Sequence, residues 1–103
     1  MIFKDKVAVI TGGAHGIGSC VAASFREAGA HAVIIDIEPG DWYTGDLADK
    51  QVLEDFAASV IAQYGHVDYL VNNALPLMKG IDECTYEEFE YAQRVGVTAP
   101  FYL

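Results

Sequence analysis

Short apolar runs alternate along the chain with longer stretches whose apolar residues recur at helical spacing. The apolar runs lie at residues 6–11, 32–36 and 67–72, with a shorter one around 42–44. Continuous apolar runs of this length are typical of parallel strands that are buried on both faces. The alternation predicts an α/β fold with a doubly wound parallel sheet in three layers. We expect the strand order 3-2-1-4, with right-handed crossovers and helices on both faces.

Two amphipathic stretches predict the helices that cover this sheet. In residues 17–28 the expected core stripe comprises Ile17, Val21, Phe25 and Ala28, widened by Cys20 and Ser24. In residues 50–64 it comprises Val52, Leu53, Phe56, Ala57, Val60 and Ile61. Gly29 and Gly65 follow directly, and a left-handed glycine commonly ends a helix. Cys20 is therefore expected to be a packing residue rather than a reactive thiol.

A third helix is predicted after a loop at Leu75–Asp82. Thr85 and Glu88 have the spacing of a capping box, in which the two side chains satisfy free N–H groups at the helix start. The apolar positions that follow at helical spacing are Phe89, Ala92, Gly96, Ala99 and Leu103.

The connection between the second and third strands is unusually short. Only Ile37–Asp41 separate Asp36 from the strand expected around Trp42–Thr44. A parallel crossover usually takes a dozen or more residues with a helix. Five residues that include Pro39 and Gly40 are too few, so we predict an abbreviated connection without a helix.

A glycine-rich turn joins the first strand to the first helix. Gly12 would allow a tight turn, Gly16 a close approach of the backbone to a ligand, and Gly18 close packing of the helix on the strand. The N–H groups and the dipole at the start of the helix would favour an anion such as a pyrophosphate. Such motifs have false positives, and a flexible turn without a ligand is the alternative.

An acidic residue supports the nucleotide interpretation. Asp36 ends the second strand, 20 residues after Gly16 (36 − 16). An acid at this distance hydrogen-bonds a ribose 2′-hydroxyl and repels a 2′-phosphate, so the sequence favours NAD over NADP. His15 lies inside the turn, where its side chain either approaches the cofactor phosphates or points to solvent. The sequence leaves both open.

Several motifs together resemble the classical short-chain dehydrogenase/reductase family. They are TGGAHGIG at residues 11–18, Asp36, the pair Asp46-Leu47, and LVNNA at residues 70–74. The resemblance implies a Rossmann-like, NAD-binding half-domain over residues 1–103, in which Asp46 and a backbone N–H contact the adenine ring. The implied cofactor-binding residues are Thr11, Gly12, His15, Gly16, Ile17, Gly18, Asp36, Ile37, Asp46, Leu47, Asn73 and Ala74.

The chain departs from the family pattern in three respects. Leu75 stands where the family usually has glycine, and Gly96 stands where it has asparagine. Because Pro100 has no N–H, the Gly96 carbonyl lacks its usual helical donor, and we expect a kink that leaves this carbonyl free for water. The family's catalytic serine and YxxxK motif are absent. We therefore assign no catalytic residue and expect a fragment, truncated within a helix and inactive alone.

Composition limits the classes of partner. The net charge is −9 with only six Lys and Arg residues, which argues against nucleic acid and anionic membranes. No apolar stretch of 18 residues and no signal peptide is found, so we expect a cytoplasmic protein. Cys20, Cys84 and the histidines show no metal-ligand spacing, so we expect neither a metal site nor a disulfide framework.

The predicted function is that of the cofactor-binding part of an NAD(H)-dependent oxidoreductase that acts on a small alcohol or carbonyl. The fourth strand would form an open sheet edge, and such edges pair with other chains, so a homo-oligomer is expected. Two alternatives remain, a non-catalytic nucleotide-binding module and an inactive structural fragment.

Overall fold

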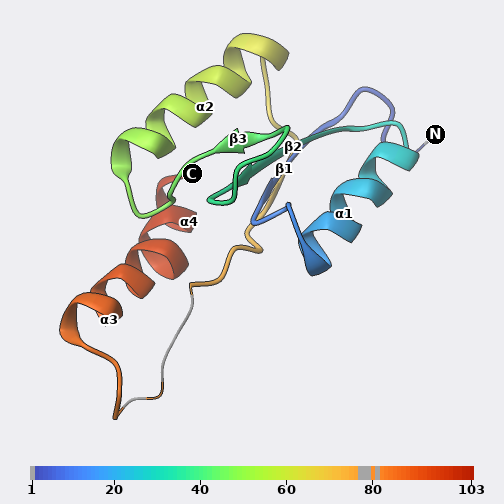
Figure 1. The fold of residues 1–103 in the computed structure, drawn as a ribbon. Coiled ribbons are helices and arrows are strands. Elements are labelled where there is room, and N and C mark those ends of the chain that lie inside the picture. The colour runs from blue at the N-terminus through green and yellow to red at the C-terminus, as the bar shows by residue number, and fades with distance from the viewer. Residues whose placement is uncertain (1, 77–79, 81) are drawn as a thin grey trace.

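A computed structural model describes residues 2–76, 80 and 82–103 of the chain. The elements in order are β1 (Val7–Thr11), α1 (Gly16–Glu27), β2 (His31–Asp36), β3 (Tyr43–Thr44), α2 (Lys50–Tyr64), β4 (Tyr69–Val71), α3 (Tyr86–Gln93), the π-helical segment η1 (Arg94–Thr98) and α4 (Ala99–Tyr102). Figure 1 shows α1 and α2 on opposite sides of the sheet, with α3 extending away from it.

The four strands form one parallel sheet in the order β3-β2-β1-β4, which confirms the predicted order. β1 is an interior strand, and all five of its residues are buried. Its side chains alternate between two apolar cores. Val7 and Val9 pack with α2 and the C-terminal helical segments, whereas Ala8 and Ile10 pack with α1. Helices therefore cover both faces, and the predicted three-layer arrangement is confirmed.

The stripe predicted on α1 is buried only in part. Gly18 and Ala22 are the buried residues of this helix. The Ile17 side chain is 77% exposed and Cys20 is exposed, so the prediction that Cys20 packs in the core is wrong. The reason is that α1 packs on β1 and β2, and its remaining apolar side chains extend beyond the strands that it covers.

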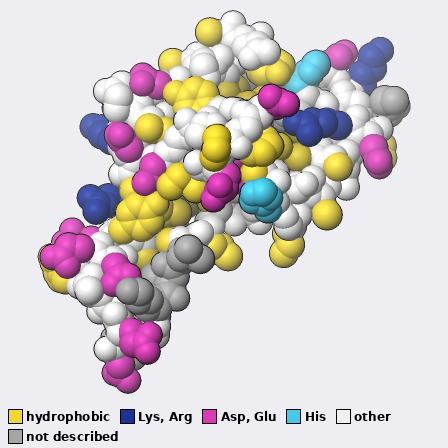
Figure 2. All heavy atoms as spheres, in the orientation of Figure 1, with side chains coloured by type: hydrophobic (Ala, Val, Ile, Leu, Met, Phe, Trp, Pro, Cys, Tyr) yellow, Lys and Arg dark blue, Asp and Glu magenta, His cyan; other side chains and the backbone are white. Residues whose placement is uncertain are grey.

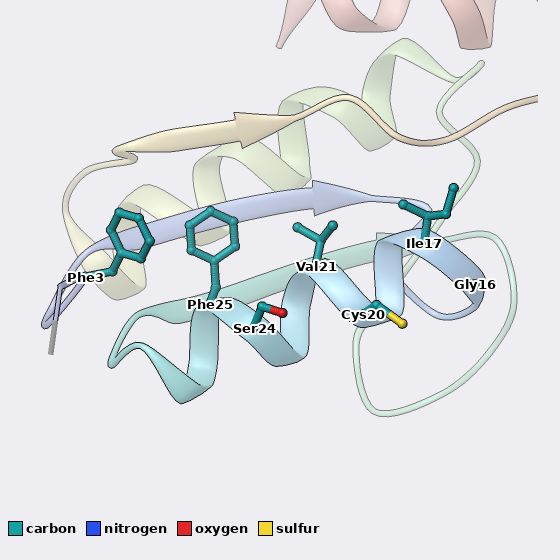
Figure 3. A pocket seen from close by; sticks show the side chains of 7 residues that line it. All are labelled: Phe3, Gly16, Ile17, Cys20, Val21, Ser24 and Phe25. Carbon is teal, nitrogen blue, oxygen red and sulfur yellow. The ribbon is translucent and has the colours of Figure 1, made fainter.

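An open apolar hollow of about 670 Å³ lies along this side of α1. Figure 3 shows Ile17, Val21 and Phe25 in a row along the helix, with Phe3 beyond its last turn. The rings of Phe3 and Tyr69 contact Phe25 at centroid distances of 5.3 and 5.7 Å. Aromatic contacts thus close the hollow at the Phe3 and Phe25 end and leave it open at the Ile17 end.

The connection between β2 and β3 contains no helix, as its length predicted. Trp42 lies before β3 rather than in it, and its indole N–H donates to the Glu38 carbonyl at 2.7 Å. Gly40 packs against the indole so closely that a Cβ there would lie 2.3 Å from the ring. The Trp42 side chain therefore packs in the connection between β2 and β3, which contains no crossover helix.

The helix α2 has its predicted bounds, and Gly65 ends it in the left-handed conformation, at φ 81°. Leu53, Phe56 and Val60 are buried, but the predicted core residues Ala57 and Ile61 are exposed. Leu53, Phe56 and Val60 lie on the face of α2 that packs against the apolar core, and Ala57 and Ile61 lie outside that face. Gly29, at φ 95°, has the left-handed conformation expected after α1.

Two other predicted elements differ in extent. β4 is three residues long rather than six, and Val67 before it is 42% exposed. The predicted capping box of α3 is present. Within the C-terminal helical segments, Ala99 is buried as predicted and Val95 is buried beside it, whereas the predicted Phe89 is 50% exposed because α3 extends away from the sheet. Residues 77–79 and 81 of the predicted loop lie outside the described residues.

Within the described ranges, no helix has both the length and the apolar content needed to cross a bilayer.

Asp68 joins the start of β4 to the start of β1. Its Oδ2 accepts a hydrogen bond from the Val7 N–H at 2.8 Å and lies 3.0 Å from His66 Nε2. The Val7 N–H is the main cause that lowers the pKa of the Asp68 carboxyl from its ordinary value of 3.8; burial opposes the shift, and the charges of His66 and Lys6 add to it. The ionised carboxylate therefore stabilises the fold at pH values above 3.8.

We expect Asp68→Asn to flatten the acid limb of the stability profile. A lowered folded-state pKa contributes stability that is present above the unfolded value and is lost as the pH falls through the folded value. In urea titrations from about pH 6 to about pH 2, the unfolding midpoint of the parent protein should fall more steeply below about pH 4 than that of the variant. Parallel curves would contradict the assignment.

Candidate functional site

A cavity of about 500 Å³ lies at the carboxyl ends of β1, β2 and β4. Every predicted cofactor residue except Thr11, Gly16 and Gly18 lines it. Ligands of open α/β sheets bind at this edge. Sequence reasoning did not assign five other lining residues, which are Ile35, Gly45, Pro76, Tyr91 and Val95.

The glycine turn has the conformations that its residues permit. Gly12 and Gly16 have φ values of 65° and 56°, in the left-handed region that favours glycine. Gly18 has an ordinary φ but no room, because a Cβ there would lie 2.6 Å from the Gly12 carbonyl oxygen and 2.5 Å from Asn73 Nδ2. The predicted roles of Gly12 in turning and of Gly18 in close packing are therefore found in the geometry.

The start of α1 carries no neutralising side chain. His15 is the N-cap residue, but no side-chain hydrogen bond caps the helix and the first turn holds no acidic residue. His15 is exposed and lines the cavity. The positive end of the helix dipole is thus left uncompensated at the cavity mouth, an arrangement that suits an anion.

Asp36 connects the two loops that flank the cavity. Its Oδ2 accepts the Ala14 N–H at 3.1 Å, and its Oδ1 accepts the Glu38 N–H at 3.0 Å. The carboxylate is therefore oriented by the glycine turn on one side and by the β2–β3 connection on the other. Since a carboxylate offers about four acceptor positions, capacity for a ligand hydroxyl remains.

Thr11 is buried, at 2% exposure, and its hydroxyl organises the loop after β4. Oγ1 accepts the N–H groups of Asn73 and Ala74 at 3.0 and 3.1 Å and donates to the Val71 carbonyl at 3.4 Å. The Asn73 side chain then donates to the Gly12 carbonyl at 3.0 Å. The two cavity-forming loops are thus joined by hydrogen bonds between residues about sixty positions apart in sequence.

Asp46 lies at the cavity wall after β3. Its Oδ1 accepts the Ala48 N–H at 2.9 Å, and the Tyr91 hydroxyl lies 3.1 Å from both of its carboxylate oxygens. Desolvation, with the hydrogen bond and charge of Asp46, raises the pKa of Tyr91. The hydroxyl therefore stays protonated and donates to the carboxylate. The neighbouring Leu47 is buried in the core.

The sequence model of the short chain dehydrogenase family matches residues 6–103. The chain belongs to this family. An uncharacterized oxidoreductase of Thermotoga maritima is 36% identical over 97% of this chain and 46% of its own length. Momilactone A synthase of Oryza sativa is 39% identical over 93% of the chain and 41% of its own length. The chain thus spans about half the length of the curated relatives that it matches.

Solved structures of short-chain dehydrogenases have the same arrangement. A metagenomic short-chain oxidoreductase in complex with NADP superposes with a TM-score of 0.90 at 25% identity, over 98% of this chain and 53% of that one. An apo SCOR enzyme from Clostridium thermocellum gives 0.84 at 37% identity, over 92% of this chain and 44% of its own.

Gly96, at the family's asparagine position, lies in a π-helical segment. The N–H of Ala99 donates to the carbonyl of Arg94, five residues earlier, where an α-helix would use the residue four positions back. Pro100 follows in the first turn of α4, where a missing N–H is tolerated. The structure thus has a π turn at this position, and the expected kink and the availability of the Gly96 carbonyl to water stay predictions.

Leu75, at the family's glycine position, is 87% exposed at the edge of the cavity. Its side chain therefore narrows the cavity mouth without filling the core.

Proposed function

We propose that this chain forms the cofactor site of an NAD(H)-dependent oxidoreductase that acts on a small alcohol or carbonyl compound. The observation that carries the choice of cofactor is the Asp36 carboxylate, which two backbone N–H groups hold at the cavity wall. Among the described residues, no Lys or Arg side chain lines the cavity. A 2′-phosphate would meet a carboxylate without a compensating cation, whereas a 2′-hydroxyl would find an acceptor.

In this proposal the uncapped start of α1 binds the pyrophosphate and Asp46 contacts the adenine. Bound nicotinamide would supply the hydride acceptor or donor. The chain's own residues bind and orient the dinucleotide, and Leu75 shields one side of the cavity mouth. A structural relative with the same fold is in complex with NADP. The proposed preference for NAD over NADP therefore depends on these side chains and not on the fold.

The test compares NADH with NADPH by fluorescence titration of the purified protein. We expect tighter binding of NADH, and we expect Asp36→Asn to reduce the preference by about tenfold or more, since a hydrogen bond to a charged group contributes about 1.5–3 kcal/mol. Asp41→Asn is the matched control, because Asp41 is an exposed acid of the same connection and does not line the cavity. Equal affinity for both nucleotides in the parent protein would overturn the NAD assignment.

A nucleotide-binding module without turnover is the second candidate. Gly96 and Leu75 favour it because both replace residues of the family pattern. Reduction of NAD by the protein with any of a panel of small alcohols would contradict this candidate.

A further inference from the structure

Tyr91 lines the same cavity as the predicted cofactor residues, although no sequence motif includes it. It comes from α3, a helix with no buried residue that extends away from the sheet (Figure 1). Its hydroxyl nevertheless reaches Asp46, which is 45 positions earlier in the chain. Figure 2 shows acidic side chains gathered over the part of the surface that α3 forms.

The hydrogen bonds of Asp46 leave little freedom for its carboxylate. A carboxylate has about four acceptor positions. The Ala48 N–H takes one on Oδ1, and the Tyr91 hydroxyl lies equally close to both oxygens. Capacity for a further donor is therefore left on the Oδ2 side. One donor from the same turn as Asp46 and one from α3 fix the direction of the carboxylate.

We propose that Tyr91 is a positioning residue that orients Asp46 toward the exocyclic amine of the nucleotide base and thereby sets a preference for adenine. This inference rests on the proposed function, because it takes Asp46 as the contact of the base. An adenine presents an exocyclic amine that can donate to the carboxylate, whereas hypoxanthine presents a carbonyl oxygen in its place. An oriented carboxylate accepts from the amine and repels the carbonyl.

The experiment measures the affinity of the purified protein for AMP, IMP and nicotinamide mononucleotide by calorimetry. The parent protein should prefer AMP over IMP. Tyr91→Phe keeps the ring and removes the hydroxyl. It should weaken AMP binding about fivefold to tenfold and reduce the AMP/IMP ratio, because a carboxylate that the hydroxyl no longer holds must be ordered when the base binds. The affinity of this variant for nicotinamide mononucleotide, which lacks adenine, should stay the same.

Two controls separate positioning from a general loss of structure. Tyr86→Phe removes a hydroxyl from an exposed residue of the same helix and should change none of the three affinities. In an Asp46→Ala background, Tyr91→Phe should change AMP binding little, because residues that act as a pair are not additive. Thermal melts establish that each variant is folded.

Unchanged AMP affinity and an unchanged AMP/IMP ratio in Tyr91→Phe would overturn the inference while the proposed function stands. Tighter AMP binding in this variant would also overturn it, because Tyr91 would then compete with the base for Asp46. If the parent protein binds neither AMP nor NADH, the proposed function and the inference fail together.

Discussion

Thr11→Val is expected to destabilise the fold by about 1–3 kcal/mol, because it leaves the Ala74 N–H without its acceptor and leaves the Asn73 N–H only the Val71 carbonyl, at 3.1 Å. Valine matches threonine in shape, so the core packing around this buried position is kept. The N–H groups of Asn73 and Ala74 lose the hydroxyl oxygen that now accepts both at 3.0 and 3.1 Å. Urea unfolding should show a lower midpoint with an unchanged slope.

The matched control is Thr11→Ser, which keeps the hydroxyl and loses one methyl group. It should cost about 1 kcal/mol, as expected for one buried methyl group. NADH binding should weaken in the valine variant even below its melting temperature, because Asn73 and Ala74 form part of the cavity wall. Equal stabilities of the serine and valine variants would show that the hydroxyl does not support this loop.

Gly18→Ala is expected to cost about 1–3 kcal/mol and to abolish measurable cofactor binding. A Cβ at this position would lie 2.6 Å from the Gly12 carbonyl oxygen, which belongs to the backbone and cannot rotate away. The first turn of α1 must then move off the glycine turn, and the 3.0 Å bond between Asn73 Nδ2 and the Gly12 carbonyl must lengthen. Overpacking of a close contact has costs of this size.

Gly96→Ala is the matched control for this substitution. Gly96 is also helical, but a Cβ there would meet no heavy atom within 4 Å. Its replacement should stabilise the protein by up to about 1 kcal/mol, since alanine is the better helix former. Thermal unfolding followed by circular dichroism compares the stabilities of the two variants directly. Equal changes in stability in Gly18→Ala and Gly96→Ala would contradict the close packing of α1 at Gly18.

Local patterns predicted the individual strands and the edge of the sheet that carries the site, and the topology of the doubly wound fold then predicted the order of the strands. The run from Val7 to Ile10 is apolar, as a strand buried on both faces requires, and the glycine turn follows directly after Thr11. The helix bounds of α2 follow in the same way from spacing and from Gly65.

The burial of particular side chains was harder to predict, because periodicity gives the face of a helix but not what that face meets. Ile17 and Cys20 continue the stripe of α1 but extend past the strands that α1 covers. In the C-terminal helical segments, Ala99 is buried as its spacing predicts, but Phe89 is 50% exposed because α3 extends away from the sheet. Both errors come from tertiary geometry that the sequence pattern does not contain.

Tyr91 and the role of Thr11 were missed for another reason. Each acts through a hydrogen bond to a residue at least 45 positions away, and no local motif signals such a pair. A signal was nevertheless present for Tyr91, since it lies on α3 one turn before Val95, which faces the core.

The dependence of the glycine turn on the loop after β4 has a consequence for how the site forms during synthesis. Strand, turn and helix leave the ribosome together within the first 27 residues, yet the side chain that clamps Gly12 is Asn73. Contacts of such large sequence separation form late, because loop closure must come first. A nascent chain would therefore carry the complete glycine motif for the time needed to add some fifty further residues before Asn73 fixes the geometry of the turn.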